Sequence, residues 1–400
     1  MLHDATQHEE LGAEPWDEGR VRAAIRQIVA ETEEAFDPDL WWPLHPSDED
    51  GTAFDLYATH ALYVGAAGVL WALHRLATAD VVQLSHDYTS AAARLHEDYL
   101  RHTGGEAPAV PGLWAGEAGV LLVADLLAPD PRRRARLDAV IRENARNVTR
   151  ELMWGSPGTM LAAAEMYART GDERWRDAWA ESADWLWDEW RLDDELGCFL
   201  WTQQLYGKIA TYLGPAHGFA GNVLALARLV TAERRDLLAE RATDTIRRLA
   251  FREDGLANWG PVAGSALEVP GQGIRVQWCH GAPGIVTSLA TLPSEPELDG
   301  LLVAGGELTW AAGPHGKGPG LCHGTAGNGY AFLALYARTG DPLWLERARA
   351  FAAHALAQVE SERERHGRGR FSLWTGDLGS AVFALQCIDG EPGFPTIDVW

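Results

Sequence analysis

Seven stretches of this chain are almost wholly apolar, and each one follows directly after a Gly-x-x-Gly sequence. A helix that is apolar on every side is buried on every side, so each stretch predicts a helix in the interior of the fold. One Gly-x-x-Gly means little in a chain with 42 glycines, but seven that each open an apolar segment indicate an internal repeat. The seven pairs are Gly65 and Gly68, Gly116 and Gly119, Gly155 and Gly158, Gly218 and Gly221, Gly281 and Gly284, Gly324 and Gly327, and Gly376 and Gly379.

Charged segments precede the glycine pairs, as over residues 18–36, 132–152 and 232–250. Their apolar residues recur at three- and four-residue steps, which predicts helices with one buried and one solvated face. Each repeat therefore predicts one outer and one inner helix. Seven such pairs predict an all-α fold, a double-layered α/α toroid whose inner helices line the centre; an open helical solenoid is the alternative.

The toroid would place seven inner-helix N-termini near one end of the ring. Strand signals are sparse, but the irregular segments 191–216 and 252–278 are expected to carry short hairpins over that end. We expect one domain over residues 1–400, with residues 1–15 flexible.

The charge balance excludes one class of partner. Lys and Arg total 34 and Asp and Glu total 57, for a net charge of −23, and no basic stripe that would bind nucleic acid is present. No apolar run reaches the ~18 residues that a membrane span needs, and the acidic, polar first ten residues do not resemble a signal peptide. A cytoplasmic location is expected.

Two repeats carry Cys-His directly before the glycine pair: Cys279-His280-Gly281 and Cys322-His323-Gly324. Equivalent positions of neighbouring repeats lie side by side in a closed ring, so we expect the two thiols to meet. Two thiolates and one imidazole suit a tetrahedral zinc with an open fourth position, and the spacing leaves either His280 or His323 as third ligand. The alternative is that both cysteines are small buried hydrophobes, as we expect for Cys198 and Cys387.

Three further residues are candidates for catalysis. His217 precedes Gly218 in the same register without a neighbouring thiol, which suits a general acid or base; a structural histidine is the alternative. Arg275, four residues before Cys279, would stabilise a developing negative charge or else lie on the surface. Glu151, four residues before Gly155, would orient His217 or else be solvated.

These motifs resemble those of the LanC family of lanthionine synthetase C-like proteins, and most closely those of its eukaryotic-type branch. The residues that carry the resemblance are 216–221 (AHGFAG), 278–284 (WCHGAPG), 320–328 (GLCHGTAGN), and the tail from Phe371-Ser372-Leu373 to Phe394-Pro395. It covers essentially the whole chain.

The resemblance implies an α/α toroid that binds one zinc ion through Cys279, Cys322 and His323. It also implies that a zinc-activated thiol adds to dehydroalanine or dehydrobutyrine and forms a thioether, with His217 as acid or base. Arg275 and Glu151 match the cyclase pattern, although the acidic residue there is aspartate. The cyclases close lanthionine rings within a peptide, whereas glutathione is the added thiol in the eukaryotic-type branch.

The chain departs from the family pattern at two further places. His280 stands where the cyclases usually have tyrosine, which favours the eukaryotic-type branch, and Ser156 stands where that branch carries a basic residue. The expected partners are a dehydrated peptide or protein, a small thiol, and a separate dehydratase, kinase or lyase that makes the dehydro residue. A non-catalytic zinc-containing toroid that binds peptides and a toroidal glycosidase or epimerase are the competing functions; the last would need two pocket carboxylates.

Overall fold

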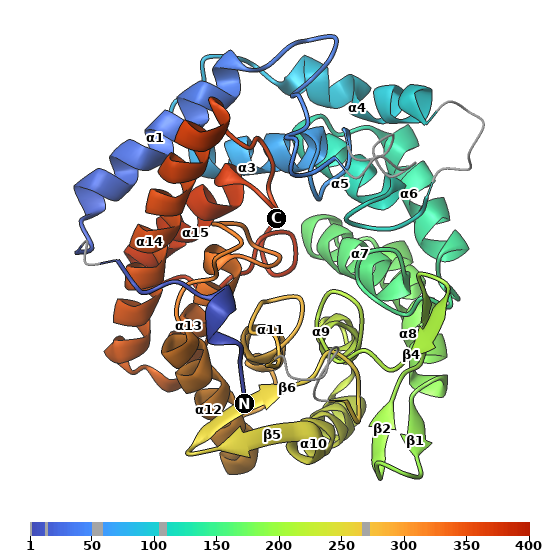
Figure 1. The fold of residues 1–400 in the computed structure, drawn as a ribbon. Helices are drawn as coiled ribbons and strands as arrows, with labels where there is room; N and C mark the ends of the chain where they lie inside the picture. The colour runs from blue at the N-terminus through green and yellow to red at the C-terminus, as the bar shows by residue number, and fades with distance from the viewer. Residues whose placement is uncertain (1, 13–14, 50–58, 104–109, 266–272) are drawn as a thin grey trace.

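The structure is a computed structural model, described here for residues 2–12, 15–49, 59–103, 110–265 and 273–400. Its helices form two concentric layers around one axis (Figure 1). The inner layer consists of the helices that directly follow the glycine pairs. They are α3 (Ala66–Thr78), α5 (Glu117–Leu127), α7 (Ser156–Thr170), α9 (Phe219–Ala227), α11 (Ala282–Leu289), α13 (Thr325–Thr339) and α15 (Asp377–Asp389).

The outer layer consists of the amphipathic helices, and several begin at an aspartate whose side chain accepts a backbone N–H, such as Asp17 before α1 and Asp341 before α14. In α1 the buried residues include Val21, Ile25 and Ile28, which recur at helical spacing on one face. The outer helices are α1 (Glu18–Glu34), α4 (Thr89–His102), α6 (Pro131–Glu143), α8 (Glu173–Asp188), α10 (Ala232–Leu249), α12 (Pro296–Ala312) and α14 (Pro342–His366).

The ring is closed. Each inner helix packs against the next, α15 packs against α3 at the seam, and α1 covers α15 from outside. The predicted all-α double-layered toroid is confirmed, and the open solenoid is wrong. That residues 1–400 form a single domain with a flexible stretch 1–15 stays a prediction.

Steric crowding explains why the second residue of every pair is glycine. A Cβ atom at this position would lie 1.7 to 2.3 Å from the carbonyl oxygen of the residue six positions earlier, in all seven repeats. The chain before each inner helix therefore turns back onto the first helical turn, so closely that only glycine fits. In α13 this turn is closed by a 3.0 Å hydrogen bond from Thr325 N–H to the Gly318 carbonyl.

The centre of the ring is filled with aromatic side chains. The rings of Trp114, Trp278 and Trp374, from three different repeats, are fully buried, and Trp374 lies 4.3 Å from Trp114 and 5.1 Å from Trp278 between ring centroids. Phe394 of the C-terminal tail stacks on Trp278 at 4.8 Å, and the C-terminus lies inside the ring (Figure 1). Aromatic side chains from several repeats and the C-terminal tail thus fill the centre of the ring.

Three antiparallel hairpins occur among the described residues. They pair β1 (Arg191–Asp193) with β2 (Cys198–Leu200), β3 (Gln203–Leu205) with β4 (Lys208–Ala210), and β5 (Ala250–Glu253) with β6 (Leu256–Trp259). The first two lie within the predicted segment 191–216, and the third begins two residues before the segment 252–278, because α10 ends at Leu249. Part of that segment, residues 266–272, lies outside the described residues.

The N-terminal segment contains a short 3-10 helix, η1 (Ala5–Gln7), and crosses the ring near α13. Glu9 N–H donates to the Pro314 carbonyl and Gly316 N–H to the Gln7 carbonyl, both at 2.9 Å. Across the described part of the chain, no helix is both long and apolar enough to cross a membrane.

Candidate metal centre and proton-transfer site

The turns that precede the inner helices are joined into a belt at one end of the ring. Cys279 N–H donates to the Cys322 carbonyl, Cys322 N–H to the Trp374 carbonyl, and Trp374 N–H to the Tyr63 carbonyl, at 3.0 to 3.1 Å. All four residues stand two positions before the first glycine of their repeat. The repeat register thus brings residues 43 positions apart, Cys279 and Cys322, into contact, as the sequence predicted.

Cys279, Cys322 and His323 form a compact set of ligands. The two sulfur atoms and an imidazole nitrogen all lie within 4.8 Å of one another, with both cysteines buried and His323 half-buried. Zinc–sulfur bonds of about 2.3 Å and zinc–nitrogen bonds of about 2.0 Å are compatible with ligand atoms at this separation. The residues present therefore fit a metal ion, and the set contains His323 rather than His280.

The two thiols of this set are electrostatically coupled. A hydrogen bond from the Cys322 thiol lowers the pKa of Cys279, with help from His323 and His280, although burial alone would raise it. The pKa of Cys322 is raised, because that thiol keeps the shared proton and is buried. Gln277 Nε2 also donates to the Cys279 sulfur at 3.1 Å. Without a metal, these shifts favour Cys279 as the more acidic thiol of the pair.

His217 and Glu151 form the second element of the site. His217 Nδ1 lies 3.0 Å from Glu151 Oε2, and the Glu151 side chain is fully buried. The carboxylate also accepts the backbone N–H groups of Met153, Trp154 and Gly155 at 2.7 to 3.0 Å, so it caps the turn before α7. The solvated alternative for Glu151 is wrong, because the carboxylate lies inside the turn.

This carboxylate controls the charge of His217. Burial disfavours the imidazolium, but the hydrogen bond and the negative charge of Glu151 outweigh burial and raise the pKa of His217. Because an ionised carboxylate is an acceptor only, Nδ1 carries the proton in this pair, which leaves Nε2 for a substrate.

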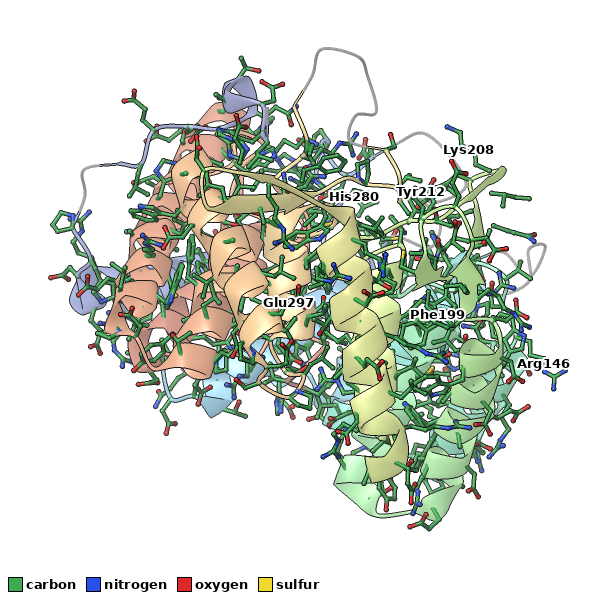
Figure 2. All side chains as sticks on the ribbon, turned by 90° about the horizontal axis from the view of Figure 1, so that it is seen from below. Arg146, Phe199, Lys208, Tyr212, His280 and Glu297 are labelled. Carbon is green, nitrogen blue, oxygen red and sulfur yellow. The ribbon has the colours of Figure 1, made fainter. Side chains whose placement is uncertain are left out.

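His280 connects this pair to the ligand set. Its ring lies 6.1 Å from that of His217 and 6.5 Å from that of Tyr212, and it directly follows Cys279. Figure 2 shows His280 and Tyr212 near each other at one end of the molecule, away from Glu297 and Arg146. The ligand set and the His217–Glu151 pair thus share one site.

Arg275 lies on the irregular chain before Cys279, and its side chain is half-buried. Its carbonyl accepts a hydrogen bond from Asn258 Nδ2 at 3.2 Å, and a Cβ at Gly281 would lie 2.2 Å from that oxygen. Gly281, at φ +114°, therefore fixes the main chain of Arg275 beside the site. A role for the guanidinium in stabilising negative charge stays a prediction.

Sequence reasoning missed three residues of the site. The Tyr63 side chain hydrogen-bonds the Cys322 thiol, and the positive charge of Lys317 lowers the pKa of that thiol. The ring of Tyr206 lies edge-on to that of His217, with 5.7 Å between ring centroids. Tyr63 occupies the same register as the cysteines and could have been found from it. Lys317 and Tyr206 lie outside that register, in a glycine-rich loop and at a hairpin turn.

Comparison with known proteins agrees with this architecture. A family model for lanthionine synthetase C-like proteins matches residues 57–399. Glutathione S-transferase LANCL1 of Danio rerio is 34% identical over 200 residues, 47% of this chain and 46% of the relative. LanC-like protein GCL1 of Arabidopsis thaliana is 39% identical over 135 residues, 31% of this chain and 30% of the relative, so each match spans half of that relative's length or less.

Among solved structures, nisin cyclase superposes with a TM-score of 0.62 at 16% identity, covering 92% of this chain and 94% of that one. At that identity the likeness concerns the fold. The family match, over residues 57–399, shows that the chain belongs to the lanthionine synthetase C-like family.

Proposed function

We propose that this protein is a zinc-dependent enzyme that adds an activated thiol to a dehydroalanine or dehydrobutyrine residue and forms a thioether. The observation that carries the proposal is the meeting of Cys279, Cys322 and His323 beside the His217–Glu151 pair. Three protein ligands are the usual number at a catalytic zinc, since the fourth position stays open to substrate.

Zinc on these three side chains would lower the pKa of a bound thiol and supply a thiolate nucleophile near neutral pH. His217 is suited to accept the proton that the thiol loses and to deliver it to Cα of the dehydro residue. Glu151 keeps the imidazole oriented and favours its protonated form. Arg275 is proposed to stabilise the negative charge that develops on the carbonyl oxygen.

The thiol is proposed to be a peptide cysteine or a small thiol. The name of the zebrafish relative favours glutathione, and the fold of nisin cyclase favours a peptide. The partner is then a dehydrated peptide or protein. A separate dehydratase, kinase or lyase would supply its dehydro residue, and we propose that the reaction takes place in the cytoplasm.

The test combines metal analysis with a thiol-addition assay. Purified wild-type protein is expected to contain zinc in a one-to-one ratio and to add glutathione, or a peptide cysteine, to a dehydroalanine peptide. Cys322→Ala should lose both metal and activity, whereas Cys387→Ala, at a buried thiol outside the site, should keep both. Full zinc with no addition of any thiol would instead support the non-catalytic peptide-binding toroid.

A further inference from the structure

The hairpin β3–β4 ends in a strained aromatic turn at the edge of the site. Leu205 pairs with Lys208, which leaves Tyr206 and Gly207 as a two-residue turn, and their φ angles are +53° and +70°. Such turns favour asparagine or glycine at the first position, because most other side chains are strained at positive φ, whereas asparagine can hydrogen-bond its own backbone there. A tyrosine held in this conformation is a departure that packing alone does not explain, since the residue is 65% exposed.

The tyrosine side chain reaches back from the turn into the site. Its ring lies edge-on to that of His217, with 5.7 Å between centroids and 83° between planes, and its hydroxyl forms a hydrogen bond with the Trp154 side chain. Trp154 is itself fixed, because its backbone N–H donates to Glu151 Oε1 at 2.7 Å. Tyr206 thus contacts the two turns that carry the proposed proton-transfer pair.

The direction of that hydrogen bond determines where the phenol proton goes. The indole of Trp154 is a donor only, so the Tyr206 oxygen accepts from it, and the Tyr206 O–H can donate to a different acceptor. Desolvation at the edge of the site and the negative charge of Glu151 raise the pKa of Tyr206, despite the opposing Trp154 donor. The phenol therefore stays protonated near neutral pH.

The hairpin is anchored to the body and exposed at its tip. Gln204 N–H donates to the Val148 carbonyl at 3.1 Å, and Tyr212 N–H donates to Gln203 Oε1 at 2.8 Å. Figure 2 shows Lys208, next to the turn, at the same end of the molecule as His280 and Tyr212. A substrate that approaches this end can therefore reach the Tyr206 hydroxyl.

We infer that Tyr206 is a further substrate-contacting residue, whose hydroxyl donates a hydrogen bond to the carbonyl oxygen of the dehydro residue. The inference rests on the proposed function. As the thiol sulfur bonds to Cβ, the electron pair of the Cα–Cβ double bond moves toward that oxygen, and the Tyr206 hydrogen bond strengthens while the phenol keeps its proton. His217 returns to Cα the proton lost by the thiol. One S–C and one C–H bond form, and one S–H bond and one C–C π bond are lost.

The test uses the full chain loaded with zinc and a dehydroalanine peptide. Tyr206→Phe keeps the ring and removes the donor, so kcat is expected to fall about a hundredfold with little change in KM, as for other oxyanion donors. Ile209→Ser, on the same hairpin and 74% exposed, is the matched control and should leave kcat unchanged. A donor that acts only on the transition state predicts this separation of kcat from KM, whereas a residue that only packs does not.

A second variant separates chemistry from stability. Tyr206→Asn places a residue that tolerates positive φ at the turn, so the melting temperature should rise while kcat falls as in Tyr206→Phe. If wild type exceeds Cys322→Ala in activity but Tyr206→Phe reacts at the wild-type rate, the role of Tyr206 is overturned and the proposed function stands. If wild type adds no thiol, both proposals fail.

Discussion

The Nδ1 atom of His217 lies 3.0 Å from Oε2 of Glu151, which is fully buried and capped by three backbone N–H groups. This carboxylate has no access to water that could screen it, so its charge acts almost entirely on the imidazole and on its own turn. The pair thus sets the pH at which the site can deliver a proton.

Replacing Glu151 by Gln should move that pH downward. The folded-state pKa of His217 is raised, so the imidazolium is present below it and is lost as the pH rises through it. Without the negative charge, burial alone would lower the pKa of His217. The alkaline limb of kcat/KM against pH is therefore expected at lower pH in Glu151→Gln than in wild type.

Glu360→Gln, on the exposed face of α14, serves as the control for this measurement and should leave the profile unchanged. Superimposable alkaline limbs in wild type and Glu151→Gln would show that His217 is not the group that the profile reports.

The two histidines that follow the cysteines should differ in metal binding. His323 belongs to the ligand set and His280 does not, so His323→Ala should release zinc, whereas His280→Ala should retain it. Loss of one of three protein ligands removes a large part of the binding free energy. Zinc content after dialysis against a mild chelator measures the difference; retention in His323→Ala with loss in His280→Ala would reverse the assignment.

Replacing the second glycine of a pair by alanine should destabilise the protein. In Gly327→Ala the new Cβ would lie 1.7 Å from the Leu321 carbonyl oxygen, so the turn before α13 must open. We expect the free energy of unfolding to fall by about 3 kcal/mol. Zinc binding should also weaken, because Cys322 and His323 lie in that turn.

Gly300→Ala is the matched control within α12. Nothing lies within 4 Å of a Cβ at that position, so alanine should stabilise the helix by about 0.5–1 kcal/mol. Denaturant unfolding of both variants checks the pair, and equal effects would mean that the close carbonyl contact does not determine the choice of glycine.

The register of the glycine pairs was enough to predict much of this molecule. It predicted the inner helices, their closure into a ring and the contact between Cys279 and Cys322, because equivalent positions of neighbouring repeats lie side by side in a closed ring. It left His280 and His323 equivalent, since both occupy the same register and only side-chain direction separates them.

Features outside the repeat could not be predicted in that way. The burial of Glu151 depends on three backbone N–H groups of its own turn, and no periodicity reports such a contact. Tyr206 reaches the site through a hairpin inserted between α8 and α9, whose length and direction are fixed by tertiary contacts.

The seam between α15 and α3 has a consequence for biosynthesis. The Cys322 N–H donates a hydrogen bond to the Trp374 carbonyl, and the ring of Trp374 packs on that of Phe394. The belt that holds the thiols and the aromatic packing behind it are therefore incomplete until residue 394 has been made. During translation Cys279 and Cys322 therefore emerge from the ribosome well before the residues that surround them in the folded ring. In that interval both thiols are exposed and open to oxidation, and folding in the cell should depend on a reducing environment or on early metal capture.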